Sequence, residues 1–203
     1  MNLIGLTGYA RSGKDTVAEM LRRLEPGSTR TSAFSDLVKL SAARSLGVLV
    51  SPDHVGTRGV REWANRFKTQ QEIQIVEEGK VVHTLTGRAF LQRYGTEAHR
   101  DIFGDDFWVD QLDLQPEPHE LLVFTDVRFD NEAAAIRAAG GEVWLVTRAI
   151  ANTGDGHRSE QLIDPTLIDR EIPNNGTLDD LKHYVELAYK GQSEGNLQTH
   201  DTL

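Results

Sequence analysis

Continuous apolar runs in this chain predict strands that are buried on both faces. Such runs occur at residues 2–7, 121–125 and 143–146. A half-exposed strand alternates apolar and polar positions, whereas a continuous apolar run is typical of a parallel sheet that carries helices on both sides.

Between these runs, apolar residues recur at helical spacing. The first such stretch includes Val17, Leu21 and Leu24 and ends at the Pro26-Gly27 pair. The pattern predicts further helices at 34–48, 57–69, 86–101 and 132–139, one that follows Asp105, and a last one marked by Leu178, Leu181 and Val185. Because helices alternate with buried strands, the sequence predicts an α/β domain with a mostly parallel sheet.

Three segments depart from this alternation. Residues 72–84 carry β-branched apolar residues on both sides of Glu78-Gly79-Lys80 and predict a β-hairpin. Residues 149–160 are rich in Gly, Asn, Asp and Ser and predict a polar loop, which is the first candidate for a lid, with 72–84 as the second. From residue 191 the chain is polar and is expected to be disordered. The expected organisation is one domain at 1–190, with a helical substrate-side insertion at about 50–115.

Composition narrows the functions that such a domain can have. The 203 residues include no cysteine, which excludes a disulfide scaffold, thiolate metal sites and cysteine nucleophiles. The net charge of −9 argues against binding a nucleic-acid polymer, although a single nucleotide needs only a local basic pocket. No apolar run is long enough to span a membrane and the first residues do not resemble a signal peptide, so we expect a cytoplasmic protein, in the host cytoplasm if the chain is viral.

A glycine-rich loop follows the first predicted strand. Residues 8–16 read Gly-Tyr-Ala-Arg-Ser-Gly-Lys-Asp-Thr and match the first seven positions of the motif G-x-x-x-x-G-K-[ST]. Gly8 and Gly13 let the backbone curl so that N–H groups point inward at phosphate oxygens, and Lys14 adds a cation for the β and γ phosphates. The loop also begins a predicted helix, which is the context that this motif requires. The sequence therefore predicts a nucleoside triphosphate site.

The eighth position of the motif should hold the hydroxyl that binds Mg²⁺, but here it is Asp15. Thr16 follows one position later and is the better candidate for that hydroxyl. Two interpretations of Asp15 stay open. It either holds a water molecule of the metal ion or is an acidic residue that complements the dipole at the start of the helix.

A second polar group follows the strand predicted at 121–125. Asp126 lies at its carboxyl end, where ligands of open α/β sheets collect and where P-loop enzymes place the carboxylate that organises Mg²⁺. Arg128 comes two residues later, and its planar guanidinium suits bidentate contact with phosphate. The alternative is a surface ion pair between Asp126 and Arg128. A phosphate loop in the same chain favours the functional interpretation.

Other candidate residues also have ordinary structural explanations. Asp155 and Glu160 could close over a substrate or simply belong to a polar loop. Arg88 and Arg100 lie in the helix predicted at 86–101, where acidic neighbours could neutralise them. A tryptophan such as Trp108 is more often a core residue than a surface on which a nucleobase stacks.

The order and spacing of these motifs resemble those of the phage-type deoxynucleoside monophosphate kinases over residues 3–182. The glycine loop has the family's pattern Gly-x-x-x-Ser-Gly-Lys-Asp-Thr. Further segments similar to family motifs lie at 34–39, 88–97, 126–132, 155–160 and 172–178, and Arg100 and Trp108 follow at family-like distances. The hairpin predicted at 72–84 has no family motif that we can match to it.

The resemblance implies a three-layer P-loop NTPase fold, with helices on both faces of a mostly parallel sheet and a lid or monophosphate-binding excursion. It implies phosphoryl transfer from ATP to a deoxynucleoside 5′-monophosphate with Mg²⁺ as cofactor. It also implies roles for individual residues. The residues that would bind ATP are Arg11, Ser12, Gly13, Lys14, Asp15 and Thr16. The catalytic residues would be Lys14, Asp126 and Arg128. The metal ion would be bound by Thr16 and Asp126. The substrate-binding residues that it implies are Val38, Lys39, Arg88, Arg100, Trp108, Arg128, Asp155 and Glu160.

Two alternative functions stay open on the sequence alone. Another small-molecule P-loop kinase, acting on phosphomevalonate or dephospho-coenzyme A, would share the phosphate machinery and differ in the acceptor pocket. A non-catalytic ATP-binding switch would need no second phosphate site, so the arginines beyond the P-loop favour an enzyme. A symmetric dimer is common for chains of this length, but the sequence carries no interface signal.

Overall fold

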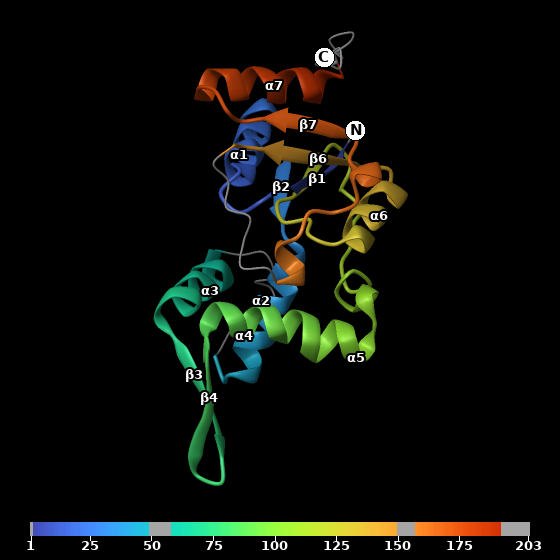
Figure 1. The fold of residues 1–203 in the computed structure, drawn as a ribbon. Helices are drawn as coiled ribbons and strands as arrows, with labels where there is room; N and C mark the ends of the chain where they lie inside the picture. Colours follow the sequence, from blue (N-terminus) through green and yellow to red (C-terminus); the bar gives the residue numbers. More distant parts are fainter. Residues whose placement is uncertain (1, 49–57, 150–156, 192–203) are drawn as a thin grey trace, which may run out of the picture.

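The centre of the molecule is a five-stranded sheet whose strands all run in parallel, in the order β2-β5-β1-β6-β7 (Figure 1). In the computed structural model, residues 2–48, 58–149 and 157–191 are described. The strands of this sheet are β1 (Leu3–Thr7), β2 (Thr29–Ser32), β5 (Leu121–Phe124), β6 (Glu142–Thr147) and β7 (Arg170–Pro173). The parallel arrangement confirms the predicted α/β class.

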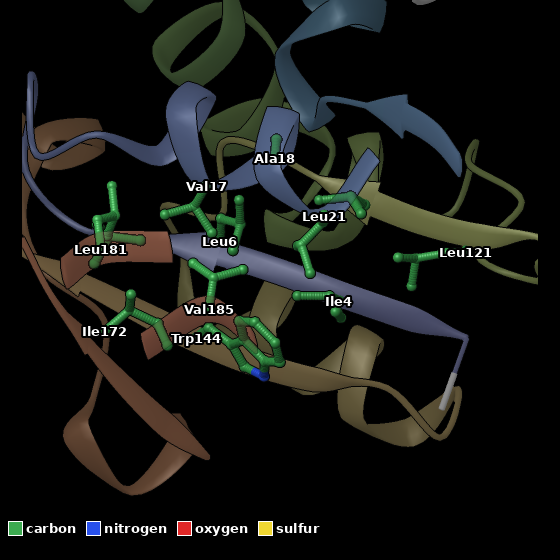
Figure 2. Packing of buried hydrophobic residues seen from close by; sticks show 12 residues of the cluster. Ile4, Leu6, Val17, Ala18, Leu21, Leu121, Trp144, Ile172, Leu181 and Val185 are labelled. Carbon is green, nitrogen blue, oxygen red and sulfur yellow. The ribbon is translucent and has the colours of Figure 1, made fainter. Parts of the chain in front are cut away.

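Helices cover both faces of the sheet and make it the middle of three layers. One face packs against α1 (Lys14–Leu24) and α7 (Leu178–Lys190), and Figure 2 shows the cluster that these helices form with Ile4, Leu6 and Trp144. The other face packs against α6 (Asp130–Ala138). Successive strand residues point to opposite faces, so β1 contributes to both clusters.

A glycine in β1 allows α6 to lie close to the sheet. A Cβ added to Gly5 would lie 2.4 Å from Cδ1 of Ile136, a side chain of α6 that is fully buried. Burial of a side chain such as Ile136 contributes about 1.5–3 kcal/mol to the free energy of unfolding. The close approach of helix and strand therefore fixes the position of α6 and of the segment that precedes it.

A second, helical part lies beside one end of the sheet (Figure 1). It contains α2 (Phe34–Ser45), α3 (Arg58–Gln70), α4 (Gly87–Gly95), a π-helical turn (Thr96–Arg100) and α5 (Asp101–Phe103). A small core of Ala42, Ala64, Phe67 and Leu91 joins α2, α3 and α4. The helices of this part form one wall of the cavity described below.

The hairpin predicted at 72–84 is present as β3 (Glu72–Glu77) and β4 (Lys80–Thr86), which pair antiparallel. Glu78 and Gly79 at its turn have φ angles of 49° and 76°. Two successive positive φ angles are typical of the two-residue turn whose twist matches that of a hairpin. The hairpin projects away from the rest of the molecule in Figure 1.

The structure also differs in detail from the predicted elements. The polar strand β2 was not predicted, because it lies at the edge of the sheet and its residues are mostly half-exposed. The helix predicted at 34–48 ends at Ser45, and the one predicted at 86–101 consists of α4, the π-helical turn and α5. The helix expected after Asp105 is a 3₁₀-helix, Asp105–Trp108.

Two predicted segments lie partly outside the described residues: 150–156 of the loop at 149–160, and 192–203 of the polar tail. Within the part of the chain that the structure describes, no helix combines the length and the apolar character needed to cross a bilayer.

Candidate active site

The loop between β1 and α1 has the backbone conformation of a phosphate-binding loop. Gly8 and Gly13 have φ angles of 130° and 109°, which residues with a Cβ rarely adopt. A Cβ on Gly8 would also lie 2.4 Å from the carbonyl oxygen of Val146. Arg11 has a φ of 65°, which costs a residue other than glycine about 1–2 kcal/mol. Strained backbone of this kind concentrates at ligand-binding loops.

Side chains occupy both the inside and the outside of this loop. The ammonium of Lys14 donates to the carbonyl oxygens of Gly8 at 2.7 Å and Tyr9 at 2.9 Å, so it lies within the curve of the loop. The hydroxyl of Ser12 is buried and has no hydrogen-bond partner among the described residues. From outside, the amide of Asn174 donates to the carbonyl oxygen of Ser12 at 2.7 Å. A curved loop with a cation inside and a hydroxyl without a partner fits polyphosphate oxygens.

The first turn of α1 continues the loop. Gly13 precedes the helix, and no side chain caps its first N–H groups. Such N–H groups, together with the positive end of the helix dipole, favour anions. Asp15 is exposed in this turn, and Thr16 is half-buried. The six predicted ATP-binding residues therefore lie together around one concave backbone.

Asp126 follows β5, the strand that pairs directly with β1. Its two carboxylate oxygens accept hydrogen bonds from the backbone N–H groups of Phe34 at 2.7 Å and Ser35 at 3.0 Å. The carboxylate therefore caps the start of α2, in addition to lying where a metal-organising residue is expected. Each carboxylate oxygen has a second lone pair, so the cap leaves capacity for another ligand.

A cavity of about 720 Å³, counting the space at its open mouth, lies between the sheet edge at Asp126 and helices α2, α3 and α4. Its lining includes every predicted substrate-binding residue whose side chain the structure describes: Val38, Lys39, Arg88, Arg100, Trp108 and Arg128. Of the other two, Asp155 lies outside the described residues, and the side chain of Glu160 is not described. The fold thus brings together residues that are far apart in the sequence.

A fully buried aspartate organises two cations at the α2–α3 side of the cavity. Asp36 pairs with Lys39 at 2.9 Å and with Arg61 of α3 at 2.6 Å. Burial alone would raise the pKa of Asp36, but the contacts with Arg61 and Lys39 outweigh it and leave the pKa below its usual value. Asp36 therefore stays ionised and holds Lys39 at the cavity wall.

A buried ion pair supports the opposite wall. One carboxylate oxygen of Glu132 contacts the guanidinium of Arg100 at 2.6 Å, and both side chains are almost completely buried. The other oxygen accepts the backbone N–H groups of Arg128 at 2.8 Å and Phe129 at 3.3 Å. Burial raises the pKa of Glu132, Asp126 acts in the same direction, and Arg100 opposes them. Glu132 therefore connects Arg100 to the backbone that carries Arg128.

The predicted ligands Arg100 and Trp108 also have partners within the protein. Arg100 donates to the carbonyl oxygen of Asp105, and its guanidinium carbon lies 4.1 Å from the centre of the Phe129 ring. The indole N–H of Trp108 donates to the carbonyl oxygen of Gly95 at 2.8 Å. Gly95 in turn lets α4 approach α2, since a Cβ there would lie 3.1 Å from Val38. These contacts hold the walls of the cavity in a fixed position.

The described end of the loop predicted at 149–160 lies against the same site. The guanidinium of Arg128 donates to the carbonyl oxygen of Ser159 at 2.8 Å, and Ser159 also lines the cavity. Arg158 forms an ion pair with Asp105 at 2.7 Å. This segment therefore contacts the residues that surround the cavity.

The fold and the site define the class of protein: a P-loop phosphotransferase, with a phosphate loop after the central strand and a cation-lined cavity at the same sheet edge. The family model "Deoxynucleotide monophosphate kinase" matches residues 31–185, so the chain belongs to that family. A protein of Acanthamoeba polyphaga mimivirus with the provisional name deoxynucleotide monophosphate kinase is 30% identical over an aligned length of 200 residues, and the alignment covers 97% of this chain and 100% of that protein. Membership of this kinase family implies the use of ATP.

Several residues of the site were not predicted from the sequence. Lys68 lines the cavity, Arg61 binds Asp36, and Asn174 holds the phosphate loop. The sequence did contain a signal for Arg61 and Lys68. They are seven positions apart in a predicted helix, which corresponds to two turns, so both lie on the same face of that helix. Asn174 has no such local signal, since its partner Ser12 belongs to the other end of the chain.

Proposed function

We propose that this protein transfers the γ-phosphoryl group of ATP to the phosphate of a deoxynucleoside 5′-monophosphate, giving ADP and a deoxynucleoside diphosphate. The observation that carries the proposal is the cation-lined cavity beside the phosphate loop, at the carboxyl ends of β5 and β1. Neighbouring strands lie only about 4.8 Å apart, so both sites open at one edge of the sheet. A switch that only bound ATP would need the loop but not a second group of cations.

In this proposal, the loop at 11–16 binds the ATP phosphates and Lys14 is its main cation. Magnesium, when bound, neutralises the phosphate oxygens and helps to orient them, and Thr16 and Asp126 are the residues that would hold it. Among the described residues, no three His, Cys, Asp or Glu side chains form a metal-binding group. A site formed by Thr16 and Asp126 would suit Mg²⁺, because this ion is usually held by one or two protein oxygens together with phosphates and water.

The acceptor phosphate would bind to Lys39, Arg88 and Arg128. These cations offset the repulsion between two anionic substrates and stabilise the charge that spreads over the phosphoryl group in the transition state. Val38 and Trp108 form walls of the acceptor cavity, and Arg100 acts through Glu132 on the position of Arg128. Asp155 and Glu160 remain proposed contacts to the sugar or base. Positioning and positive charge supply the catalysis, so no general base is required.

The test is ADP release from Mg·ATP with each of dAMP, dGMP, dCMP and dTMP and with their ribose counterparts. Release that depends on one or more deoxynucleotides supports the proposal and identifies the base. Turnover with dephospho-coenzyme A or phosphomevalonate instead would assign the cavity to another acceptor. ATP binding without acceptor-dependent turnover would favour a switch.

A further inference from the structure

Lys68 of α3 belongs to none of the motifs that point to the family, yet its side chain lines the cavity. Its ammonium forms no hydrogen bond and no ion pair with any residue that the structure describes. Lys39 on the neighbouring helix, in contrast, is held by Asp36 at 2.9 Å. A half-buried ammonium without an acceptor is unfavourable unless a ligand supplies one.

The charges that surround Lys68 come from every element of the cavity wall. Lys39 of α2, Arg88 of α4 and Arg128 after β5 repel its charge, and Asp126 attracts it. The remaining titratable groups of the lining, Arg100 and Glu132, contact each other, and burial raises the pKa of Glu132 to about 8. Three cations therefore act on the charge of Lys68, and Asp126 is the carboxylate that opposes them. This excess of positive charge matches a dianionic phosphate.

We propose that Lys68 is a fourth ligand of the acceptor phosphate, contributed by a helix outside the recognised motifs. The inference rests on the proposed function, because it assigns a residue to the acceptor site of that reaction. Lys39, Arg88 and Arg128 approach the phosphate from α2, α4 and the end of β5, and Lys68 closes the site from α3. A compact ammonium suits this position, since it can donate to three oxygens without a fixed orientation.

The proton on Lys68 gives this role a pH signature. Burial lowers the pKa of Lys68 to about 8, and the neighbouring Lys39, Arg128 and Arg88 act in the same direction. Binding of a phosphate dianion favours the charged form, so the acceptor binds best to the enzyme in which Lys68 is protonated. The KM of the deoxynucleotide should therefore rise as the pH increases through about 8, while the KM of ATP stays level.

The experiment compares the wild type with Lys68→Met and Lys68→Arg, and uses Lys80→Met at the exposed turn of the hairpin as the matched control. Lys68→Met should raise the KM of the accepted deoxynucleotide about tenfold or more, as expected for the loss of a hydrogen bond to a charged group. The rise of its KM near pH 8 should be smaller than in the wild type, because Glu132, whose pKa is also raised to about 8, is then the only one of the two groups left. Lys68→Arg should keep a low KM above pH 8, because arginine remains protonated. Lys80→Met should match the wild type in both respects.

Stability provides the check that these effects are not those of misfolding. Because the pKa of Lys68 in the folded protein lies below its ordinary 10.5, the charge destabilises the fold below about pH 8, and this penalty disappears as the pH rises from 8 to 10.5. Lys68→Met should therefore have a Tm at neutral pH at least as high as that of the wild type. A variant that melts lower, or that has the wild-type KM and pH profile, overturns the assignment.

The outcome also separates this inference from the proposed function. If the wild type phosphorylates a deoxynucleotide and Lys68→Met is unaffected, the function stands and the role of Lys68 is wrong. If the wild type phosphorylates none, the function is wrong, and binding of inorganic phosphate to the ADP-loaded protein decides the role of Lys68. Weaker phosphate binding by Lys68→Met than by Lys80→Met supports it, and equal binding overturns it.

Discussion

At the scale of single residues, Lys14 has the most direct connection to the chemistry. We expect Lys14→Ala to lose turnover by about 10²-fold or more, because the variant lacks the cation that we propose binds the transferring phosphate. The fold should survive, because this ammonium donates to carbonyl oxygens of the loop itself, those of Gly8 and Tyr9. Steady-state kinetics and a thermal melt test both statements. Lys182→Ala, on the exposed side of α7, is the control, and near-normal turnover by Lys14→Ala would contradict the ATP site.

Glu132 is the residue whose loss should affect stability and acceptor binding together. Glu132→Ala leaves the buried guanidinium of Arg100 and the N–H groups of Arg128 and Phe129 without their acceptor. We expect the free energy of unfolding to fall by about 3–5 kcal/mol and the KM of the acceptor to rise, because Arg128 loses its support. Urea unfolding and kinetics measure the two effects.

The matched variant for that prediction replaces both members of the pair. Arg100→Leu with Glu132→Leu removes the buried charge as well as its partner, so it should be more stable than Glu132→Ala alone. If the double variant is the less stable of the two, the unpaired charge of Arg100 is not what destabilises Glu132→Ala, and our account of this wall is wrong.

At the scale of elements, the sequence predicted what neighbouring residues determine locally. The glycine loop, the strand before it and the helix after it follow from a short motif, and the hairpin follows from β-branched residues around Glu78-Gly79. Strand β2 could not be predicted in this way, because its polar residues are placed by pairing with β5 and by the ion pair between Arg30 and Glu120 at 2.9 Å. Asp126 was expected near the metal, but its cap on α2 depends on a contact between distant segments.

The hairpin offers a prediction at this scale, because its outer part adds no buried side chain to the core. All residues at 75–83 are exposed and none lines the cavity, and Gln74 and Thr84 are register partners. We expect replacement of 75–83 by Asn-Gly to close a shorter hairpin, since this dipeptide favours the required turn. The melting temperature should change by only a few degrees and turnover should be unchanged.

A matched variant with Gly-Pro in place of Asn-Gly cannot form the same turn, and it reports how far the shortened strands depend on turn geometry. Loss of turnover in the Asn-Gly variant, with the fold intact, would show that the projecting hairpin acts on the substrate side, as the second lid candidate would. No residue of the hairpin at 72–86 lines the cavity, which argues against that role.

At the scale of the whole molecule, charge is distributed unevenly. The chain carries a net charge of −9, yet its cavity gathers cations from α2, α3, α4 and the segment after β5. The net charge therefore argued against a nucleic-acid polymer as ligand. The cation-lined cavity could be identified only in the folded structure, because its residues are far apart in the sequence. Arg61 links the two phosphate sites, since it pairs with Asp36 on the acceptor side and also interacts electrostatically with Asp126 and Asp15.

The two sites should consequently accept one molecule that spans both. We expect adenosine joined to the accepted deoxynucleoside through an oligophosphate chain to bind more tightly than ATP or the deoxynucleotide alone, because binding of the second end becomes intramolecular. The analogue should raise the melting temperature more than an equimolar mixture of the two substrates does. Calorimetry and thermal melts measure these effects.

The control analogue has the same two nucleosides joined by a single phosphate, which cannot supply one phosphate group to Lys14 and another to Arg128. It should lack the additional affinity, and Lys14→Ala should lose the additional affinity of the long analogue. Equal binding of the long and short analogues would mean that the cavity and the phosphate loop do not act on one reaction. A gain with the long analogue alone would place both substrates in line at the edge formed by β1 and β5, where direct transfer between them requires them to be.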